Sequence, residues 1–508
     1  MRLLSRYIAL GLIFAALAGC GGGGGSGSDI STQPLPVIAN PDTFYIADQD
    51  TDGVDELYQV DSTNPGVSRK LNSPLVSGGE VTGFTVSADG SQVVYRADQI
   101  TNEKNEIFFV NTDNPGVSVK LNADLISGAD VSSIYGDTSI FSNYSPDGRS
   151  FYYLADPLAD GTKEVYKVEL DTPGVATRMS SADVSGLGVT RFMISHNSNF
   201  LVYLAAEMGD SQIQLFRVDV ADPGNAAVLN LPLDISRDVK ILNFHIRPDD
   251  QTVIYSADQD EQNKFEIQQV YFTAGQTTEK VTPVLPAFAD AQRFRVGSDG
   301  QRIFYLADQE TDGVRELYQV YLSTPGTSYK VNGGLVTGGE VSLDLEVASD
   351  NSFVVYRANQ DDEDFWELYR SSTSTPGVST KLNGALTLAG DRFGPIYQHA
   401  LAADDETLIF LAEKDTAGVK ELYQLDINSP GISTKISGPL SGNLSIDEGF
   451  KLTEDGSRVV YRVSPQSGDG AQLFQIRLDI PGVASRINSP LVTGGNAGGN
   501  FGLDFTAL

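Results

Sequence analysis

Two loops of this chain carry acidic residues at the spacing that a hard metal ion requires. The first reads Asp-x-Asp-x-Asp-Gly-x-x-Glu and runs through Asp48, Asp50, Asp52, Gly53 and Glu56. Carboxylates at alternate positions can converge on one cation, and the glycine allows a sharp bend between them. The pattern therefore predicts a calcium ion as the ligand of this loop.

The second loop keeps the acidic positions of the first. Its residues are Asp308, Glu310, Asp312 and Glu316. An acidic hairpin with an Asp-Gly turn would give the same pattern without a metal, and the final Glu would then belong to the strand that follows. Glu106 and Glu367 favour this alternative, because they keep the Glu without the acidic triplet. Both interpretations stay open at the level of the sequence.

The single Cys of the chain lies where a lipid attachment would need it. Arg2 and Arg6 precede an apolar run over residues 8–18, which is too short to span a bilayer as a helix. The following Leu17-Ala18-Gly19-Cys20 resembles a bacterial lipobox, in which the Cys becomes the lipidated first residue of the mature protein. We therefore expect a signal peptide over residues 1–19, a lipid on Cys20, and a Gly/Ser-rich tether over residues 20–40.

Residues 41–508 repeat one unit with a period of about 50 residues. Each unit places an aromatic residue inside a short apolar run, often after an Asp-Gly turn. The nine aromatic residues are Tyr45, Tyr95, Tyr153, Tyr203, Tyr255, Tyr305, Tyr356, Phe410 and Tyr461. Such regular spacing predicts one repeat array rather than several unrelated domains.

Three further motifs follow the aromatic run in a fixed order. Glu-Leu-Tyr comes first, as at residues 56–58, then a Pro-Gly turn, as at residues 65–66, and then Lys-Leu-Asn, as at residues 70–72. Pro fixes φ for the turn, and Gly accepts the positive φ after it. The segments between the turns alternate apolar and polar residues and are too short for a crossover helix. Each unit is therefore predicted to form four short strands.

A four-stranded sheet of about 50 residues cannot bury both of its faces alone. Sheets arranged radially around an axis bury their faces against each other and protect their edges. We therefore predict an all-β fold, a single β-propeller of nine four-stranded blades, with eight blades as the alternative. The first unit lacks its first strand, and residues 501–505 have the missing pattern, so we expect the C-terminal strand to complete the first blade and close the ring.

The repeat resembles that of a known propeller family. Ser145-Pro146-Asp147-Gly148 followed by an aromatic strand is similar to the WD-like repeat of the TolB family, over roughly residues 43–508. The resemblance implies the propeller fold and is a poor guide to function, because the same repeat occurs in the propellers of prolyl-oligopeptidase-type peptidases. Those peptidases carry a hydrolase domain with a Gly-x-Ser-x-Gly elbow, a motif that this chain lacks.

The charge balance and the cysteine count exclude several classes of function. The chain has 67 Asp+Glu against 35 Lys+Arg, for a net charge of −32. Nucleic acid is not an expected partner, because phosphate backbones are bound by basic surfaces. With one Cys, disulfide scaffolds and cysteine-rich zinc sites are excluded. Residue 21 is Gly rather than Asp, which favours the outer membrane of a bacterial envelope, facing the periplasm or the cell surface.

The repeat register also places charged residues near the propeller axis. Arg293 and Arg295 fall on one predicted innermost strand, and Asp344 and Glu346 fall on another. These residues could line a binding funnel, or they could be charged for solvation alone. The three histidines share no metal-ligand spacing, which favours structural roles, and they are His196, His245 and His399.

These observations leave three hypotheses for the function. The first is a non-catalytic envelope lipoprotein, anchored to the membrane by its lipid, whose propeller binds a protein, peptide or glycan partner. The second is a hydrolase or lyase that acts on an envelope polysaccharide or peptide in the propeller funnel, since propellers host both roles. The third is a calcium-stabilised adhesion or scaffold module built on the acidic loops. No cofactor other than calcium is expected.

Overall fold

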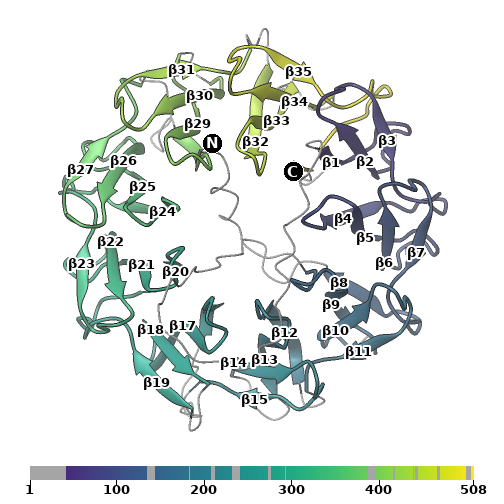
Figure 1. The fold of residues 1–508 in the computed structure, drawn as a ribbon, viewed down its shortest axis with the longest axis horizontal. Helices are drawn as coiled ribbons and strands as arrows, with labels where there is room; N and C mark the ends of the chain where they lie inside the picture. The colour runs from purple at the N-terminus through teal and green to yellow at the C-terminus, as the bar shows by residue number, and fades with distance from the viewer. Residues whose placement is uncertain are drawn as a thin grey trace, which may run out of the picture.

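The computed structural model describes residues 42–133, 143–158, 160–181, 184–207, 212–230, 241–272, 276–291, 293–386, 396–415, 418–438, 440, 444–465, 470–498 and 505–507. In this part of the chain the strands pair into nine four-stranded antiparallel sheets, which stand around an axis as the blades of a propeller (Figure 1). The prediction of an all-β propeller with nine blades is confirmed. No helix among these residues is long and apolar enough to cross a membrane.

Blade 1 combines β36, β1, β2 and β3, and blades 2 to 9 follow in chain order from β4 to β35. The innermost strands are β36 (Phe505–Ala507), β4 (Val81–Val86), β8 (Asp130–Ser133), β12 (Val184–Ile194), β16 (Ile241–Ile246), β20 (Arg293–Val296), β24 (Val341–Val347), β28 (Ile396–Leu401) and β32 (Leu444–Leu452). The second strands are β1 (Asp42–Ala47), β5 (Gln92–Ala97), β9 (Ser150–Asp156), β13 (Phe200–Glu207), β17 (Thr252–Glu261), β21 (Arg302–Ala307), β25 (Phe353–Ala358), β29 (Thr407–Ala412) and β33 (Arg458–Pro465). The third strands are β2 (Glu56–Asp61), β6 (Glu106–Asn111), β10 (Glu164–Glu169), β14 (Gln214–Asp219), β18 (Lys264–Tyr271), β22 (Glu316–Tyr321), β26 (Glu367–Ser372), β30 (Glu421–Asp426) and β34 (Gln472–Arg477). The outermost strands are β3 (Ser68–Lys70), β7 (Ser118–Lys120), β11 (Ala176–Arg178), β15 (Ala227–Val228), β19 (Thr277–Lys280), β23 (Ser328–Lys330), β27 (Ser379–Lys381), β31 (Ser433–Lys435) and β35 (Ala484–Arg486).

Blade 1 takes strands from both ends of the described chain. β36 pairs antiparallel with β1, so that Phe505 lies opposite Tyr45. The Gly66 N–H donates to the Ile487 carbonyl at 3.0 Å and joins blade 1 to blade 9. The predicted closure is confirmed at Phe505, whereas residues 501–504 of the predicted strand lie outside the described residues. The ring therefore cannot open without breaking a sheet.

The repeated aromatic residues lie on the second strand of each blade and are buried. In eight blades the ring stacks on an aromatic residue of the third strand, with centroids between 5.2 and 6.0 Å apart. In blade 5, Tyr255 lies opposite Gln268 instead. Several of the tyrosine hydroxyls have a polar partner, as where Tyr45 donates to Gln49 Oε1 at 2.9 Å. These pairs explain why the aromatic residue recurs: it fills the middle of each sheet.

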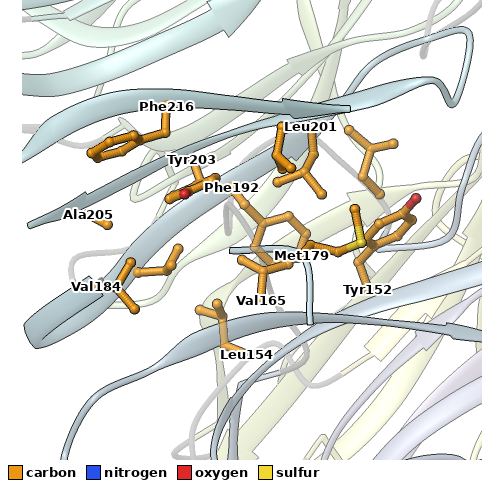
Figure 2. Close-up of a cluster of buried hydrophobic side chains, with 13 residues drawn as sticks. Tyr152, Leu154, Val165, Met179, Val184, Phe192, Leu201, Tyr203, Ala205 and Phe216 are labelled. Atoms are coloured by element: carbon orange, nitrogen blue, oxygen red, sulfur yellow. The ribbon is translucent and has the colours of Figure 1, made fainter. Parts of the chain in front are cut away.

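The hydrophobic core lies between the blades. Nine clusters of buried apolar side chains in the described residues each join two neighbouring blades. Figure 2 shows the cluster between blades 3 and 4, where Tyr152 and Leu154 of blade 3 lie against Phe192 and Leu201 of blade 4. Because each blade buries its faces only against its neighbours, the gain from apolar burial requires the complete ring.

A side chain from the outer edge satisfies the same backbone donor in every blade. In blade 1 the Asn72 Oδ1 accepts the Leu57 N–H at 2.8 Å, and the equivalent bond recurs in all nine blades of the described chain. Ser180, Thr282 and Ser437 replace the Asn in blades 3, 5 and 8. This bond is the structural reason for the Asn of the Lys-Leu-Asn motif.

The Pro-Gly turns join neighbouring blades at the outer edge. In eight blades the glycine N–H donates to a carbonyl of the preceding blade, as from Gly116 to Leu71 at 2.9 Å. Blade 5 has no Pro-Gly turn, and there the Gln276 Nε2 donates to the Leu229 carbonyl at 2.7 Å. A side chain thus replaces the missing backbone donor, and the belt of bonds continues around the described ring.

Candidate functional site

The innermost strands form the inner wall of the ring, and their register repeats from blade to blade. In blades 4 to 7 a buried residue lies opposite the second-strand tyrosine: Phe192, Phe244, Phe294 and Leu345. The residues directly before and after it belong to the other face of the strand, because side chains alternate. Several of these flanking residues have titratable side chains, and we call them the inner-wall cluster: Arg191, His245, Arg293, Arg295, Asp344 and Glu346.

The inner-wall cluster occupies part of the ring only. The positions that Arg293 and Arg295 hold in blade 6 are taken by Gly83 and Thr85 in blade 2. The sequence-based placement of Arg293, Arg295, Asp344, Glu346 and His245 on innermost strands is confirmed. Because these positions vary while the fold repeats, the fold itself does not require a charge there.

Arg293 and Arg295 are two cations outside the ion pairs of the described residues, although Arg295 interacts electrostatically with Glu346 of the next blade. Both are exposed, and within the described residues their side chains form no hydrogen bond or ion pair. They lie two residues apart on β20, which places them on one side of the strand and about 7 Å apart. On the next blade the equivalent acid has a partner, because Asp344 forms an ion pair with Arg357 at 2.9 Å. The two guanidinium groups of β20 thus differ from Asp344 in being both exposed and outside an ion pair of the described residues.

The neighbouring titratable groups are held away from their usual charge states. Burial, with a further contribution from Asp344, raises the pKa of Glu346 to about 7, although the positive charge of Arg295 opposes the shift. Burial lowers the pKa of His245 to about 3, and His196, Arg191 and Arg295 add to this effect. At neutral pH the imidazole is therefore uncharged, while Glu346 is close to its titration midpoint.

The other two histidines have structural roles. His196 lies in the turn after β12, and its Nδ1 is 2.9 Å from the Asp250 Oδ1 of the next blade. His399 takes the core position on β28 opposite Phe410, where burial lowers the pKa of its imidazole to about 4. These contacts agree with the sequence interpretation.

The acidic loop of blade 1 is organised around backbone amides and a lysine. Asp48 accepts the N–H groups of Gly53 and Asn496, and so holds the hairpin to the neighbouring loop. The Nζ of Lys70 lies 2.9 Å from Asp50 and 2.5 Å from Glu56. Asp52 is exposed. The structure therefore brings Asp50 and Glu56 together, but on an ammonium group rather than around an open position.

The acidic loop of blade 6 repeats this arrangement. Asp308 accepts the Gly313 N–H at 3.0 Å, and Lys330 lies 2.7 Å from Glu310 and 3.1 Å from Glu316. Asp312 is exposed. No group of three or more potential metal ligands is assembled anywhere among the described residues. This donor set fits an ammonium better than calcium, and calcium binding by the eight acids stays a prediction.

The Glu of each loop is the first residue of a third strand and pairs across the blade. In seven blades of the described chain it forms an ion pair with the cation of the outermost strand. Both motifs stand in the sequence, but the pairing between them was not predicted. The two residues of each pair are 14 positions apart, as are Glu56 and Lys70 or Glu316 and Lys330. This constant separation is the signal in the sequence that could have predicted the ion pair.

An open groove lies beside the first acidic loop, between blades 1 and 2. Its volume is about 610 Å³, and Thr51, Glu56, Lys70, Leu75 and Gly79 contribute to its lining. Its two charged lining residues, Glu56 and Lys70, already form the structural ion pair. The predicted lipidation site at Cys20 lies outside the described residues.

No protein-family model and no curated protein sequence matches the chain. Among solved structures, a eukaryotic initiation factor shares 9% identity over 90% of this chain and 98% of that chain, with a TM-score of 0.51. An oligogalacturonate lyase from Vibrio parahaemolyticus shares 17% identity over 76% of this chain and 98% of that chain, with a TM-score of 0.40. A putative TolB from Agrobacterium tumefaciens shares 14% identity over 47% of this chain and 78% of that chain, with a TM-score of 0.31.

The chain spans about half the length of a puromycin hydrolase that it also matches, 52% of that chain at 15% identity and a TM-score of 0.42. Identities this low show the fold alone, and the structures named above include both enzymes and proteins with other roles. The chain is a β-propeller whose structural neighbours include a putative TolB.

Proposed function

We propose that this protein is a lipid-anchored lipoprotein of the bacterial cell envelope whose propeller binds a protein, peptide or glycan partner without catalysing a reaction. The observation that carries the proposal is the pair of exposed arginines on the inner wall, Arg293 and Arg295. Across the blades, the cations of the repeat are paired with the Glu of the third strand. Two adjacent cations without such a role, in a chain of net charge −32, are best explained by a ligand that supplies the opposite charge.

The proposed anchor supports a binding role at a membrane. A lipid on Cys20 would be joined to blade 1 by the Gly/Ser-rich segment over residues 20–40. A flexible segment of that length has a mean reach of about 25 Å, so the propeller would stay near the bilayer and still reorient. Such a tether suits a protein that presents a face to a neighbour in the envelope, with the outer membrane as the proposed location.

Fractionation of cells tests the anchor. The wild-type protein should fractionate with the outer membrane and incorporate a labelled fatty acid, whereas a Cys20→Ala variant should do neither. A wild-type protein that takes up no fatty acid would overturn the anchor while leaving the propeller untouched.

Crosslinking in intact cells, followed by purification, tests the binding role. The wild-type protein should capture one stoichiometric partner, and the double variant Arg293→Ala/Arg295→Ala should capture at most a tenth as much. The matched control is Arg149→Ala, since Arg149 is also exposed and its side chain forms no ion pair within the described residues. Equal capture by all three proteins would place the partner away from the inner wall.

A hydrolase or lyase is the second candidate, and one observation favours it. His245, Arg295 and Glu346 lie at the same register position on three consecutive blades. A carboxyl near its titration midpoint could act as acid or base, with a guanidinium and a neutral imidazole as the groups that bind an anion and donate a hydrogen bond. Pure protein that degrades an envelope polysaccharide or peptide, and loses this activity in His245→Gln and Glu346→Gln, would replace the binding proposal.

A further inference from the structure

The innermost strand of blade 6 is an open sheet edge. β20 pairs with β21 alone in the described chain, and the register from Arg293 to Val296 runs without a bulge. Backbone N–H and C=O groups on the other side of such a strand are free to pair with an added strand. Peptides in extended conformation bind many proteins in this way.

The side chains of β20 specify what kind of strand fits. Arg293 and Arg295 alternate along the edge with the buried Phe294, so they share one side of the strand. Oppositely charged residues placed across neighbouring strands stabilise a sheet, and arginine binds a carboxylate through two parallel hydrogen bonds. An added strand with an acidic residue at every second position would place its carboxylates about 7 Å apart, which matches the interval between Arg293 and Arg295.

We infer that the inner edge of blade 6 takes up an extended acidic peptide as an additional strand, with carboxylates at alternate residues bound by Arg293 and Arg295. This inference rests on the proposed function and names its partner class. A peptide fits better than an acidic glycan, because only a peptide supplies both the backbone ladder and carboxylates at the strand interval.

A comparison with other blades explains why blade 6 is the acceptor. At the equivalent positions β24 carries Asp344 and Glu346, which would repel an acidic strand. β4 carries Gly83 and Thr85, which offer it no charge. β12 and β32 carry one cation each at these positions, Arg191 and Lys451, so β20 is the only innermost strand of the described residues with two.

Binding of synthetic peptides to the mature full-length chain, measured by calorimetry, tests the inference. The probe is a peptide with Glu-Val-Glu-Val-Glu at its centre. We expect the double variant Arg293→Ala/Arg295→Ala to bind at least tenfold more weakly, and Arg149→Ala to bind as the wild type does. A second peptide with the same composition but contiguous Glu residues should also bind at least tenfold more weakly than the probe. Equal affinity for the two peptides would overturn the match in spacing.

Two further ligands separate strand addition from simple charge attraction. A version of the probe with N-methyl groups on alternate amides keeps its carboxylates but loses donors, and we expect at least a tenfold loss of affinity. An oligogalacturonate that binds as tightly as the probe would overturn the choice of a peptide. If cells yield a partner that the double variant still captures, this inference fails while the proposed function stands. If the wild-type protein captures no partner, the proposed function itself fails.

Discussion

The outer three strands of the blades and the inner wall follow opposite rules. In the outer strands the same residue types return in the same contacts, such as the Asn that caps the third strand and the Glu–Lys pair beside it. On the inner wall the backbone register repeats, but the residues change from Gly83 in blade 2 to Arg293 in blade 6 and Asp344 in blade 7. In a repeat protein, what recurs maintains the fold, and a departure from the repeat needs its own explanation.

Some departures prove to be structural. In the turn between the first and second strands, Gly90 and Gly148 have positive φ, as do Asp250, Asn351 and Asp405 at the equivalent position. Each of these three side chains accepts a backbone N–H of the preceding blade, at 2.9 Å for His196 to Asp250 and for Ser298 to Asn351. The contact offsets the strain of a left-handed conformation, which Asn and Asp tolerate best. The arginine pair has no such contact, and this difference distinguishes it as a candidate site.

Opening the ring should give the largest effect on stability. Phe505 is 1% exposed and packs in the cluster between blades 9 and 1. Phe505→Ala should lower the free energy of unfolding by about 3 to 5 kcal/mol, because a large buried side chain is lost at the closing strand. Thermal and denaturant unfolding would measure this loss of stability. The control is Thr506→Ala, because Thr506 is less buried than Phe505. Equal midpoints for the two variants would contradict the closure.

Removing the Asn side chain that caps the third strand of one blade should lower the free energy of unfolding by an intermediate amount. Asn332 is fully buried, and its Oδ1 accepts the Leu317 N–H at 2.8 Å. Asn332→Ala would leave that donor unsatisfied and cost about 2 kcal/mol. Asn332→Ser should recover most of the loss, because Ser180 and Ser437 make the same bond in blades 3 and 8. If Asn332→Ala and Asn332→Ser are equally stable in unfolding experiments, the hydrogen bond from the Leu317 N–H does not explain the Asn of the Lys-Leu-Asn motif.

On the inner wall, substitution should change the pH dependence of stability instead. The pKa of Glu346 rises on folding from 4.5 to about 7, so the folded state binds more protons than the unfolded state between these values. The stability that Glu346 contributes is present below pH 4.5 and is lost as pH rises through about 7. Glu346→Gln does not titrate, and it should therefore be about 3 kcal/mol more stable than the wild type at pH 8 and equal to it at pH 4. Parallel curves of stability against pH would show that Glu346 is not buried as described.

The smallest effect is expected at the acidic loop of blade 1. Lys70→Met should change the free energy of unfolding by about 1 kcal/mol or less, because the ion pairs are partly solvated. If the loop binds calcium, the ion must displace Lys70. Calorimetry should then show heat for the wild type, tighter binding for Lys70→Met, and no heat for Asp50→Ala. An absence of calcium-dependent heat in all three proteins would remove calcium from this loop.

The periodic features of the sequence were sufficient to predict the blades. The aromatic residue, the Pro-Gly turn and the Lys-Leu-Asn motif each act within one unit of about 50 residues, so their spacing carried the strand order and the number of units. The pairing of Glu56 with Lys70 was missed, because it depends on the register of β2 with β3, which places Tyr58 opposite Lys70. Sequence spacing alone could not distinguish an acidic metal loop from one neutralised by a lysine of the next strand.

By itself the sequence determined the all-β class, the nine repeats and the need for a C-terminal strand in blade 1, because periodicity and turn chemistry are local properties of the chain. The tertiary structure decided which charges are paired and which are free. Residues such as His245, Arg295 and Glu346 are about 50 positions apart along the chain, yet they hold the same place on adjacent blades. Only the closed ring places these blades side by side, and only there does burial alter the charge of His245 and Glu346 while leaving Arg293 and Arg295 exposed.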